Sequence, residues 1–265
     1  EVPIDHLAAE LHWQVQSLRS QGAKSAALAP SIALQARNVR FANADMQGEA
    51  QFSWHTLDGE KSAAEARLPG VLDLTGSLSR ANGTRVWRYL PLGIPAETRH
   101  YVRDAVRAGQ ASRVQFRVRG DLRHIPFSDP RQGDFHITAR VSDVNYAYVP
   151  ASPAGALPWP ALTDLSGELV FDRVSMSVRG ASGSFAGFPT LRLSKVEARL
   201  PDLEHPTVGV SADAQGPLPQ LLQLVRNSPL ARLTGNALDQ ASGTGNATLQ
   251  LHLQLPISHI EQSKV

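Results

Sequence analysis

Hydrophobic and polar residues alternate in short runs along the whole chain, and Gly, Pro, Asn and Asp separate these runs. Residues 114–119 read Val-Gln-Phe-Arg-Val-Arg, and residues 249–255 read Leu-Gln-Leu-His-Leu-Gln-Leu. Because side chains in a strand point alternately to opposite faces, each run predicts a half-buried strand with one apolar face. Many such strands in succession build a long sheet with one continuous apolar surface. The functional question is whether that surface packs against protein or is kept for another purpose.

The same pattern divides the chain into strands separated by turns. The predicted strands span residues 10–16, 32–41, 46–54, 72–78, 111–122, 133–141, 145–149, 165–171, 174–178, 182–188, 191–200, 207–214 and 247–255. The length of 265 residues fits one large all-β unit. The predicted fold class is therefore mainly β, with a long antiparallel sheet.

Two short helices interrupt the strands, near residues 97–108 and 217–226. In the first, an apolar stripe at helical spacing begins at Tyr101, and Gly109 stands where a C-terminal cap is expected. In the second, leucines fall on one face, and Pro229 follows the helix as a stop. We expect one or two short helices packed on the sheet.

The composition is that of a globular chain, with 42% hydrophobic and 19% charged residues. The net charge of +2 is too small to indicate nucleic-acid binding. The chain has no Cys, which excludes disulfides and thiolate metal sites and fits an oxidising compartment. No run approaches the ~20 apolar residues that a membrane span needs, and the first residues do not form a signal peptide. Because the chain begins without Met, we expect a piece cut from a longer protein.

Motifs that carry chemistry are missing from the sequence. None of the four Lys follows a Gly, and Gly243-Thr244-Gly245 lacks the third glycine of a dinucleotide-binding loop. Neither His-Glu-x-x-His nor Gly-x-Ser-x-Gly occurs, and the nine His are scattered. Carboxylates such as Asp129 and Asp172 stand at predicted turns, where Asp has a structural role. We therefore predict no catalytic residue, no metal and no cofactor, and a binding, conduit or structural role in place of enzyme activity.

From Trp87 onward the order of short motifs resembles the YhdP family of AsmA-like bacterial envelope proteins. The matching motifs are Trp87-Arg88-Tyr89-Leu90-Pro91, the helix over 98–108, Val114 to Leu122, Ile125-Pro126-Phe127, Gly133-Asp134-Phe135, Val141 to Tyr148, Trp159-Pro160, Leu165 to Leu169, Leu200 to Leu203 and Asn227 to Leu230. Residues 1–80 match only in strand cadence. One departure is Tyr101-Val102, where a Trp-Leu-like pair is expected, and this change keeps an apolar anchor.

The resemblance implies a twisted, U-shaped sheet that forms one continuous groove with an apolar floor over residues 1–265. Residues 1–80 would continue a preceding groove, and residues 81–265 would form the family-like segment. The resemblance also implies a Gram-negative periplasmic protein, with a parent chain anchored in the inner membrane. The implied partners are phospholipid acyl chains and the inner and outer membranes, and the implied role is lipid transport that maintains the outer-membrane permeability barrier.

The cost of exposing acyl chains to water is large enough to favour such a groove. A phospholipid has about thirty acyl CH₂ groups that each cost ~0.8 kcal/mol to expose, so bare transfer through water faces on the order of 25 kcal/mol. A continuous apolar floor removes most of that barrier while the headgroup stays in water. The candidate floor residues are Leu72, Leu74, Val114, Phe116, Val118, Leu169, Phe171, Val174, Met176, Val178, Val208, Val210, Leu249, Leu251 and Leu253. For each of them, the alternative is an ordinary core residue.

Five arginines are candidates for a headgroup-binding rim of the groove. Arg99, Arg103 and Arg107 share one face of the first predicted helix, and Arg117 and Arg119 alternate with the apolar residues of a strand. For the helix arginines, a solvated face is the other interpretation.

Three functions remain open at the level of sequence. A lipid conduit predicts an open apolar channel and unpaired strands at both ends, which makes self-association through the edges an expected property. A closed β-sandwich, as a structural or protein-binding module of the bacterial envelope, predicts two packed sheets with a filled core. A carbohydrate-binding protein needs clustered aromatic residues with carboxylates, and here only Trp159, Tyr146 and Tyr148 stand near one another.

Overall fold

The computed structural model describes residues 3–16, 30–57, 68–91, 93–150, 157–203 and 207–256. The strands are β1 (His6–Gln16), β2 (Ser31–Ala42), β3 (Met46–His55), β4 (Val71–Asn82), β5 (Val106–Asp121), β6 (Gly133–Tyr146), β7 (Leu162–Asp172), β8 (Ser175–Phe185), β9 (Phe188–Leu200), β10 (Thr207–Pro217) and β11 (Asn246–Pro256). The helices are α1 (Ala96–Ala105), α2 (Leu218–Arg226) and α3 (Leu230–Leu233), with the 3₁₀ segments η2 (Gly83–Tyr89) and η3 (Leu122–His124).

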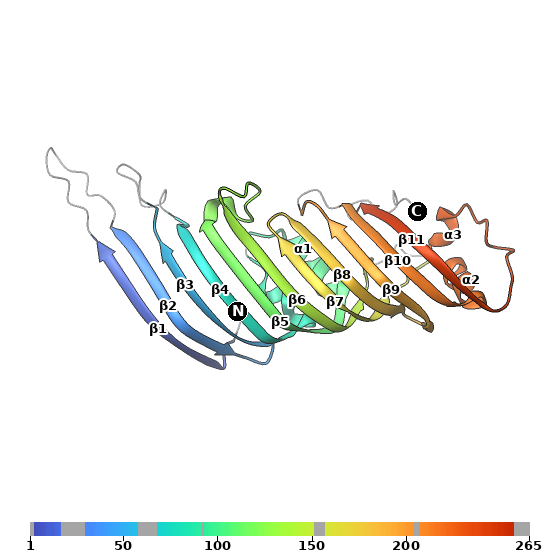
Figure 1. Ribbon diagram of the computed structural model, residues 1–265, viewed down its shortest axis with the longest axis horizontal. Helices are drawn as coiled ribbons and strands as arrows, with labels where there is room; N and C mark the ends of the chain where they lie inside the picture. Colours follow the sequence, from blue (N-terminus) through green and yellow to red (C-terminus); the bar gives the residue numbers. More distant parts are fainter. Residues whose placement is uncertain are drawn as a thin grey trace.

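All eleven strands form one antiparallel sheet in the order β1 to β11, so each strand pairs with its neighbours in the chain (Figure 1). Antiparallel neighbours need only short connections, which suits a chain of alternating runs and turns. The strands at the two ends of this order, β1 and β11, do not pair with each other, so the sheet is open. The predicted mainly β fold is confirmed, and the two packed sheets of a sandwich are not found in the described ranges.

The structure joins two pairs of segments that the sequence predicted as separate strands. β6 runs through Asp143, and β8 runs through Gly180. Both residues have a φ of 54°, and the strand register shifts beside each of them. Such a bulge adds one residue without ending the strand, so the sequence alternation breaks where the hydrogen bonding continues.

The predicted start of a strand at Val174 is wrong by one residue, because β8 begins at Ser175. Asp172 and Ser175 are cross-strand partners of β7 and β8, so Arg173 and Val174 alone close the hairpin. Arg173 has the positive φ, 51°, that a tight hairpin turn favours. Val174 therefore belongs to the turn.

The first helix ends earlier than the cap at Gly109 suggested. α1 stops at Ala105, whose carbonyl accepts a hydrogen bond of 2.8 Å from the backbone N–H of Ala147 at the end of β6. Val106 then begins β5, and Gly109 lies inside this strand with a φ of 134°. A Cβ at Gly109 would lie 3.0 Å from the Cα of Val144, so the glycine is needed for strand packing and not as a helix cap.

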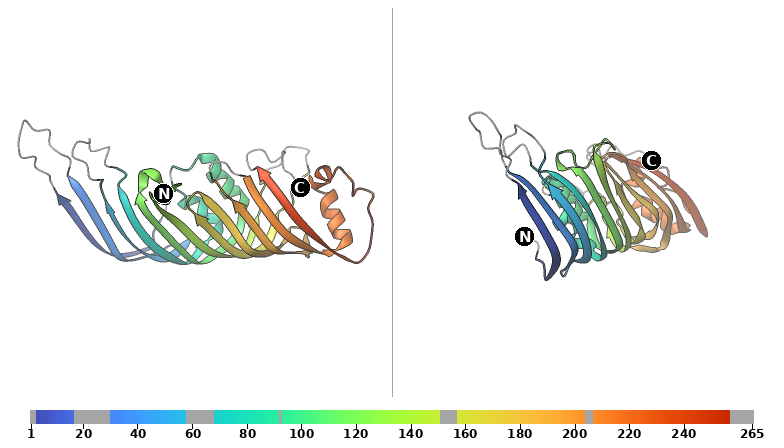
Figure 2. Two further views of the ribbon diagram at one scale, coloured as in Figure 1. Left: turned by 45° about the horizontal axis from the view of Figure 1, so that its top comes forward. Right: turned by 60° about the vertical axis from the view of Figure 1, so that its left-hand side comes forward.

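Bulges recur across the sheet and bend its strands. Six of the register shifts coincide with a residue whose φ lies between 49° and 54°. These residues are Asn38 in β2, Arg113 in β5, Asp143 in β6, Asp164 in β7, Gly180 in β8 and Lys195 in β9. A bulge bends its strand and increases the local twist. The sheet is accordingly a long twisted trough, and Figure 2 shows α1 and α2 on the inner side of the bend.

The strand register sorts side chains onto two faces of the sheet, because cross-strand partners point the same way. We call the face that carries Phe116 the apolar face and the face that carries Arg117 the polar face. Phe116 pairs with Gly76 and Ile137, whereas Arg117 pairs with Thr75 and His136. One face of the trough is thus apolar and the other is polar.

Helix α2 covers the apolar face at the C-terminal end of the sheet. Its Leu221 and Leu224 are buried against side chains of β8, β9 and β10. The strand members of this α2 core are Ala181, Phe185, Leu191, Leu193, Val196, Ala212 and Ala214. Pro219 near the start of the helix is compatible with a first turn that needs no backbone donor.

Helix α1 is held over the same face by an aromatic cluster. The hydroxyl groups of Tyr101 and Tyr146 share a hydrogen bond of 2.8 Å, and the Tyr101 hydroxyl donates to the carbonyl of Tyr148 (3.1 Å). The ring of Tyr148 meets Trp159 edge to face with centroids 5.9 Å apart. Burial raises the pKa of Tyr101 and Tyr146, so both phenols stay protonated and keep their hydrogen bonds.

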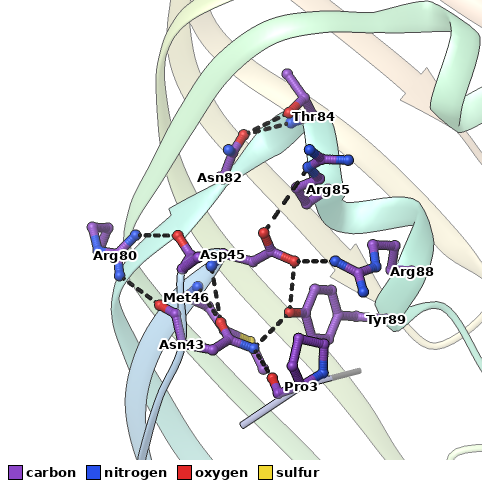
Figure 3. A network of polar contacts seen from close by, with 11 residues as sticks. Pro3, Asn43, Asp45, Met46, Arg80, Asn82, Thr84, Arg85, Arg88 and Tyr89 are labelled. Atoms are coloured by element: carbon purple, nitrogen blue, oxygen red, sulfur yellow. Dashed lines mark hydrogen bonds and ion pairs between the residues drawn. The ribbon is translucent and has the colours of Figure 1, made fainter. Parts of the chain in front are cut away.

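A buried polar network joins the first strands to η2 (Figure 3). The Asn43 amide donates to the Pro3 carbonyl (2.8 Å) and to the Tyr89 hydroxyl (2.9 Å). The Asp45 carboxylate accepts from the Tyr89 hydroxyl (2.9 Å) and from the Arg88 guanidinium (3.0 Å). Burial raises the pKa of Tyr89, which keeps its hydroxyl a donor. This Asp45 network ties the N-terminal segment, the β2–β3 turn and η2 together.

Candidate functional site

Two rows of apolar residues cross the apolar face from strand to strand. In the first row, every neighbouring pair is a cross-strand partner, and the row runs from β2 to β9. Its members are Val39, Ala50, Gly76, Phe116, Ile137, Phe171, Met176 and Leu200. With strands ~4.8 Å apart, this row is roughly 34 Å long. No polar side chain interrupts it.

The second row lies beside the first and reaches both edges of the sheet. It consists of Leu7, Phe41, Gly48, Leu78 and Val114 from β1 to β5, and of Ala139, Leu169, Val178, Ala198, Val210 and Leu253 from β6 to β11. The two parts meet at the bulge of Arg113, where Val114 and Ala139 lie opposite each other between the pairs of Ser112 and Gln115. Together the rows make a continuous apolar strip along the length of the sheet.

Glycines make the strip close-packed. The Phe116 ring covers Gly76, and a Cβ there would collide with it. A Cβ at Gly48 would lie 2.6 Å from the Leu78 Cδ2, so this leucine likewise covers its cross-strand glycine. Large side chains therefore lie over glycines of the next strand, which fills the inner surface of a bent sheet without crowding.

The exposure of the apolar face changes from one edge of the sheet to the other. On β1, Leu11 is 58% exposed and Trp13 is 69% exposed. In the α2 core, by contrast, Leu191 is fully buried. Most row members between these regions are half-buried. An apolar surface of this extent on a monomer marks a site for a partner or ligand.

The structure places every predicted floor residue except Val174 on the apolar face. Phe116, Phe171 and Met176 fall in the first row, and Val114, Leu169, Val178, Val210 and Leu253 fall in the second. Val178 and Leu251 also pack against the α2 core. The role of these residues in lipid binding stays a prediction.

Sequence reasoning missed several members of the rows. Phe41, Leu78, Ile137 and Leu200 lie in strands that it recognised, and Ile137 alternates with polar neighbours in the same way as Phe116. The alternation in their own strands was a usable signal. Their alignment into rows depends on the register between strands, which the sequence of one strand does not contain.

The predicted arginine rim is divided between two surfaces. Arg117 and Arg119 lie on the polar face, where Arg117 pairs with Asp134, and Arg119 pairs with Asp73 at 3.0 Å. This position separates them from the apolar strip by the thickness of the sheet.

The three helix arginines also have partners within the chain. Arg99 donates to the carbonyl of Pro91 (2.6 Å), Arg103 pairs with Asp104 (2.8 Å), and Arg107 donates to the carbonyl of Pro150 (3.3 Å). Arg103, about half exposed, stays available to solvent. Headgroup binding by the helix arginines remains a prediction.

The polar face carries its own shallow hollow, of about 870 Å³, over β7 to β11. Its charged lining includes Asp172, Arg179, Glu197 and Arg199, with serines between them. A twisted sheet is hollowed on both faces along opposite diagonals. The charges of the hollow are mixed and balanced, which does not favour an anionic ligand, and its lining also includes Val170, Met176, Ala198, Val210 and Leu253.

Comparison with known proteins agrees with the geometry. The intermembrane phospholipid transporter YhdP of Escherichia coli (strain K12) is 24% identical to this chain over 217 residues, which are 82% of this chain and 16% of that protein. The chain therefore spans a small part of this relative. No solved structure matches this chain. In the described ranges, no helix is long and apolar enough to cross a membrane. The family described as YhdP protein matches residues 1–265, so the chain belongs to the YhdP family.

Proposed function

We propose that this chain is a groove segment of a bridge-like phospholipid carrier. Acyl chains lie along the two apolar rows, and the headgroups remain in water at the open side of the trough. The observation that carries this proposal is the unbroken first row, which offers one apolar path across eight consecutive strands, from Val39 in β2 to Leu200 in β9.

Movement of a lipid along the sheet requires a continuous apolar surface more than tight binding at any one point. Each acyl CH₂ that leaves water contributes ~0.8 kcal/mol, so a lipid that moves between adjacent apolar residues keeps most of this gain at every step. The row members are aliphatic or aromatic residues, Met176 and glycines, and none of them carries a charge or a hydrogen-bonding side chain that could hold a headgroup in place. Such a surface supports movement along the sheet and no bond-making chemistry, which fits a carrier that is not an enzyme.

The cellular setting of the proposal follows from the family. The E. coli relative is named as an intermembrane phospholipid transporter. By analogy, this chain acts in the periplasm, within a protein anchored in the inner membrane, and passes phospholipid between the inner and outer membranes. Residues 1–80 then continue the groove of a preceding segment, and the unpaired edge of β1 is where the strands of that segment would pair.

A vesicle-to-vesicle transfer assay tests the proposal. The pair Ile137→Asp and Thr138→Asp places the same charge on adjacent residues of β6, one on the apolar face and one on the polar face. We expect Ile137→Asp to abolish capture of a fluorescent phospholipid, because an unpaired carboxylate on the path is costly to desolvate. Thr138→Asp should transfer lipid like the unmodified protein. Equal transfer by both variants would refute the proposal.

A further inference from the structure

The apolar face is not equally accessible along the sheet, because α2 occupies part of it. Leu221 and Leu224 of α2 pack on β8 to β10, at the strand ends that lie next to the helix. The first row and most of the second lie outside this contact, and only Val178 borders it. In β8 to β10 the part of the apolar face outside the α2 core is therefore the strip of these two rows, which Val208 continues in β10.

In β10, the part of the apolar face that α2 covers has smaller side chains than the part that it leaves open. Along the apolar face of this strand, Val208 and Val210 precede Ala212, Ala214 and Gly216. The alanines are buried in the α2 core, whereas the valines are half-buried and lie outside it. Small side chains let a helix approach a sheet closely, so this end of the strand is built to be covered.

The strand residues beneath α2 are covered, and Leu191, Ala212 and Ala214 are 0%, 8% and 1% exposed. A Cβ at Gly216 would lie 2.7 Å from the Cδ2 of Leu191, which is fully buried. An acyl chain could enter this region only if the helix left it.

Helix α2 is hydrogen-bonded beside the sheet at its start and to the connecting segment at its end. The backbone N–H of Leu218 donates to the carbonyl of Gly245 (2.9 Å), directly beside the paired residues Pro217 and Asn246. Arg226 at the end of α2 donates to the carbonyl of Leu238 (3.2 Å) in the segment that returns to β11. Both ends of α2 are therefore tied by hydrogen bonds to neighbouring segments of the chain.

We infer that α2 is a positioning element that confines acyl chains to the two rows where they cross β8 to β10. The inference rests on the proposed lipid-carrier function and adds a path to it. Same-face neighbours along a strand are ~7 Å apart. On β4, apolar residues continue from Leu72 to Leu78, so acyl chains can contact most of the strand. Next to α2, the apolar surface that remains open is only two rows wide.

Photolabelling with a modified lipid tests this path without altering its residues. Vesicles containing phosphatidylethanolamine with a diazirine in one acyl chain are irradiated with the purified protein, and the adducts are mapped by peptide mass spectrometry. We expect adducts at Met176, Val210 and Leu253 and background labelling at Ala212 and Ala214. Adducts at Ala212 and Ala214 at the level of the rows would overturn the inference while leaving the lipid-carrier function intact.

Two variants test whether α2 is what keeps acyl chains away from Ala212 and Ala214. In the first, residues 218–245 are replaced by Asn-Gly, which joins the paired ends of β10 and β11 in a hairpin turn. In the second, Leu221→Asp with Leu224→Asp keeps the segment and removes its apolar contact. In a folded variant of either kind, we expect labelling to spread to Ala212 and Ala214. An unchanged map would overturn the role of α2, and absence of adducts at every position of the unmodified protein would refute the carrier function together with the inference.

Discussion

The two ends of the sheet use the same apolar face in different ways. Around β8 to β11, this face is partly filled by the α2 core, where Leu191 and Ala214 are almost completely inaccessible to solvent. On β1 it is bare, with Leu11 and Trp13 more than half exposed. The covered end is thus stabilised by apolar packing, whereas the open end relies on strand pairing and on the Asp45 network. In the proposed function the sheet cannot bury all of its apolar face, and the difference shows how the chain divides packing and exposure between regions.

The largest effect on stability is expected when the same change, Leu to Ala, is made at each end of the sheet. Leu191→Ala removes a fully buried side chain from the α2 core, so we expect a loss of about 2–5 kcal/mol in the free energy of unfolding. Leu11→Ala removes a 58% exposed side chain from β1 and should change this free energy by no more than about 0.5 kcal/mol. Urea unfolding followed by circular dichroism measures both. Equal losses would mean that the two ends are packed alike.

A second pair of variants tests the polar support of the open end. Asp45→Asn keeps the side-chain shape and removes the charge that Arg88 and Tyr89 bind inside the network, which should cost about 1.5–3 kcal/mol. The control Asp73→Asn removes the partner of Arg119 on the exposed polar face and should cost less than about 1 kcal/mol. The same unfolding measurement compares them. A smaller loss for Asp45→Asn than for Asp73→Asn would assign the open end another source of stability.

The smallest effect concerns association and leaves the fold unchanged. The bare apolar face of β1 predicts concentration-dependent self-association. Leu11→Glu with Trp13→Glu should shift the protein toward the monomer in sedimentation velocity experiments. His12→Glu with Gln14→Glu adds the same charges to the opposite face of the same strand and should shift it less. If both double variants dissociate equally, net charge and not the apolar face controls association.

Local alternation predicted the faces of individual strands and did so correctly. Phe116 and Arg117 lie on opposite faces, as do Leu251 and His252, because a period of two is fixed by the strand itself. Composition and motif order also indicated the mainly β class and the family. These features depend only on residues that are close together in the chain.

Features that depend on distant residues were not predictable in this way. The rows require that Phe116 meet both Gly76 and Ile137, and the pairing of Arg119 with Asp73 requires the same register between strands. The bulge at Asp143 split one strand into two in the sequence. The position of α2 over β8 to β10 follows from packing between elements and has no local signal in its own leucines.

The most direct test of the central claim is photocrosslinking at two adjacent residues. A photoreactive phenylalanine analogue is placed at position 116 or at position 117 in living cells, with phospholipid labelled by radioactive phosphate and a known lipid carrier as the positive control. Phe116 lies in the first apolar row, whereas Arg117 lies on the polar face beside Asp134. We expect lipid adducts at position 116 and none at position 117. Silence at both positions in folded protein, or labelling at 117 alone, would contradict it.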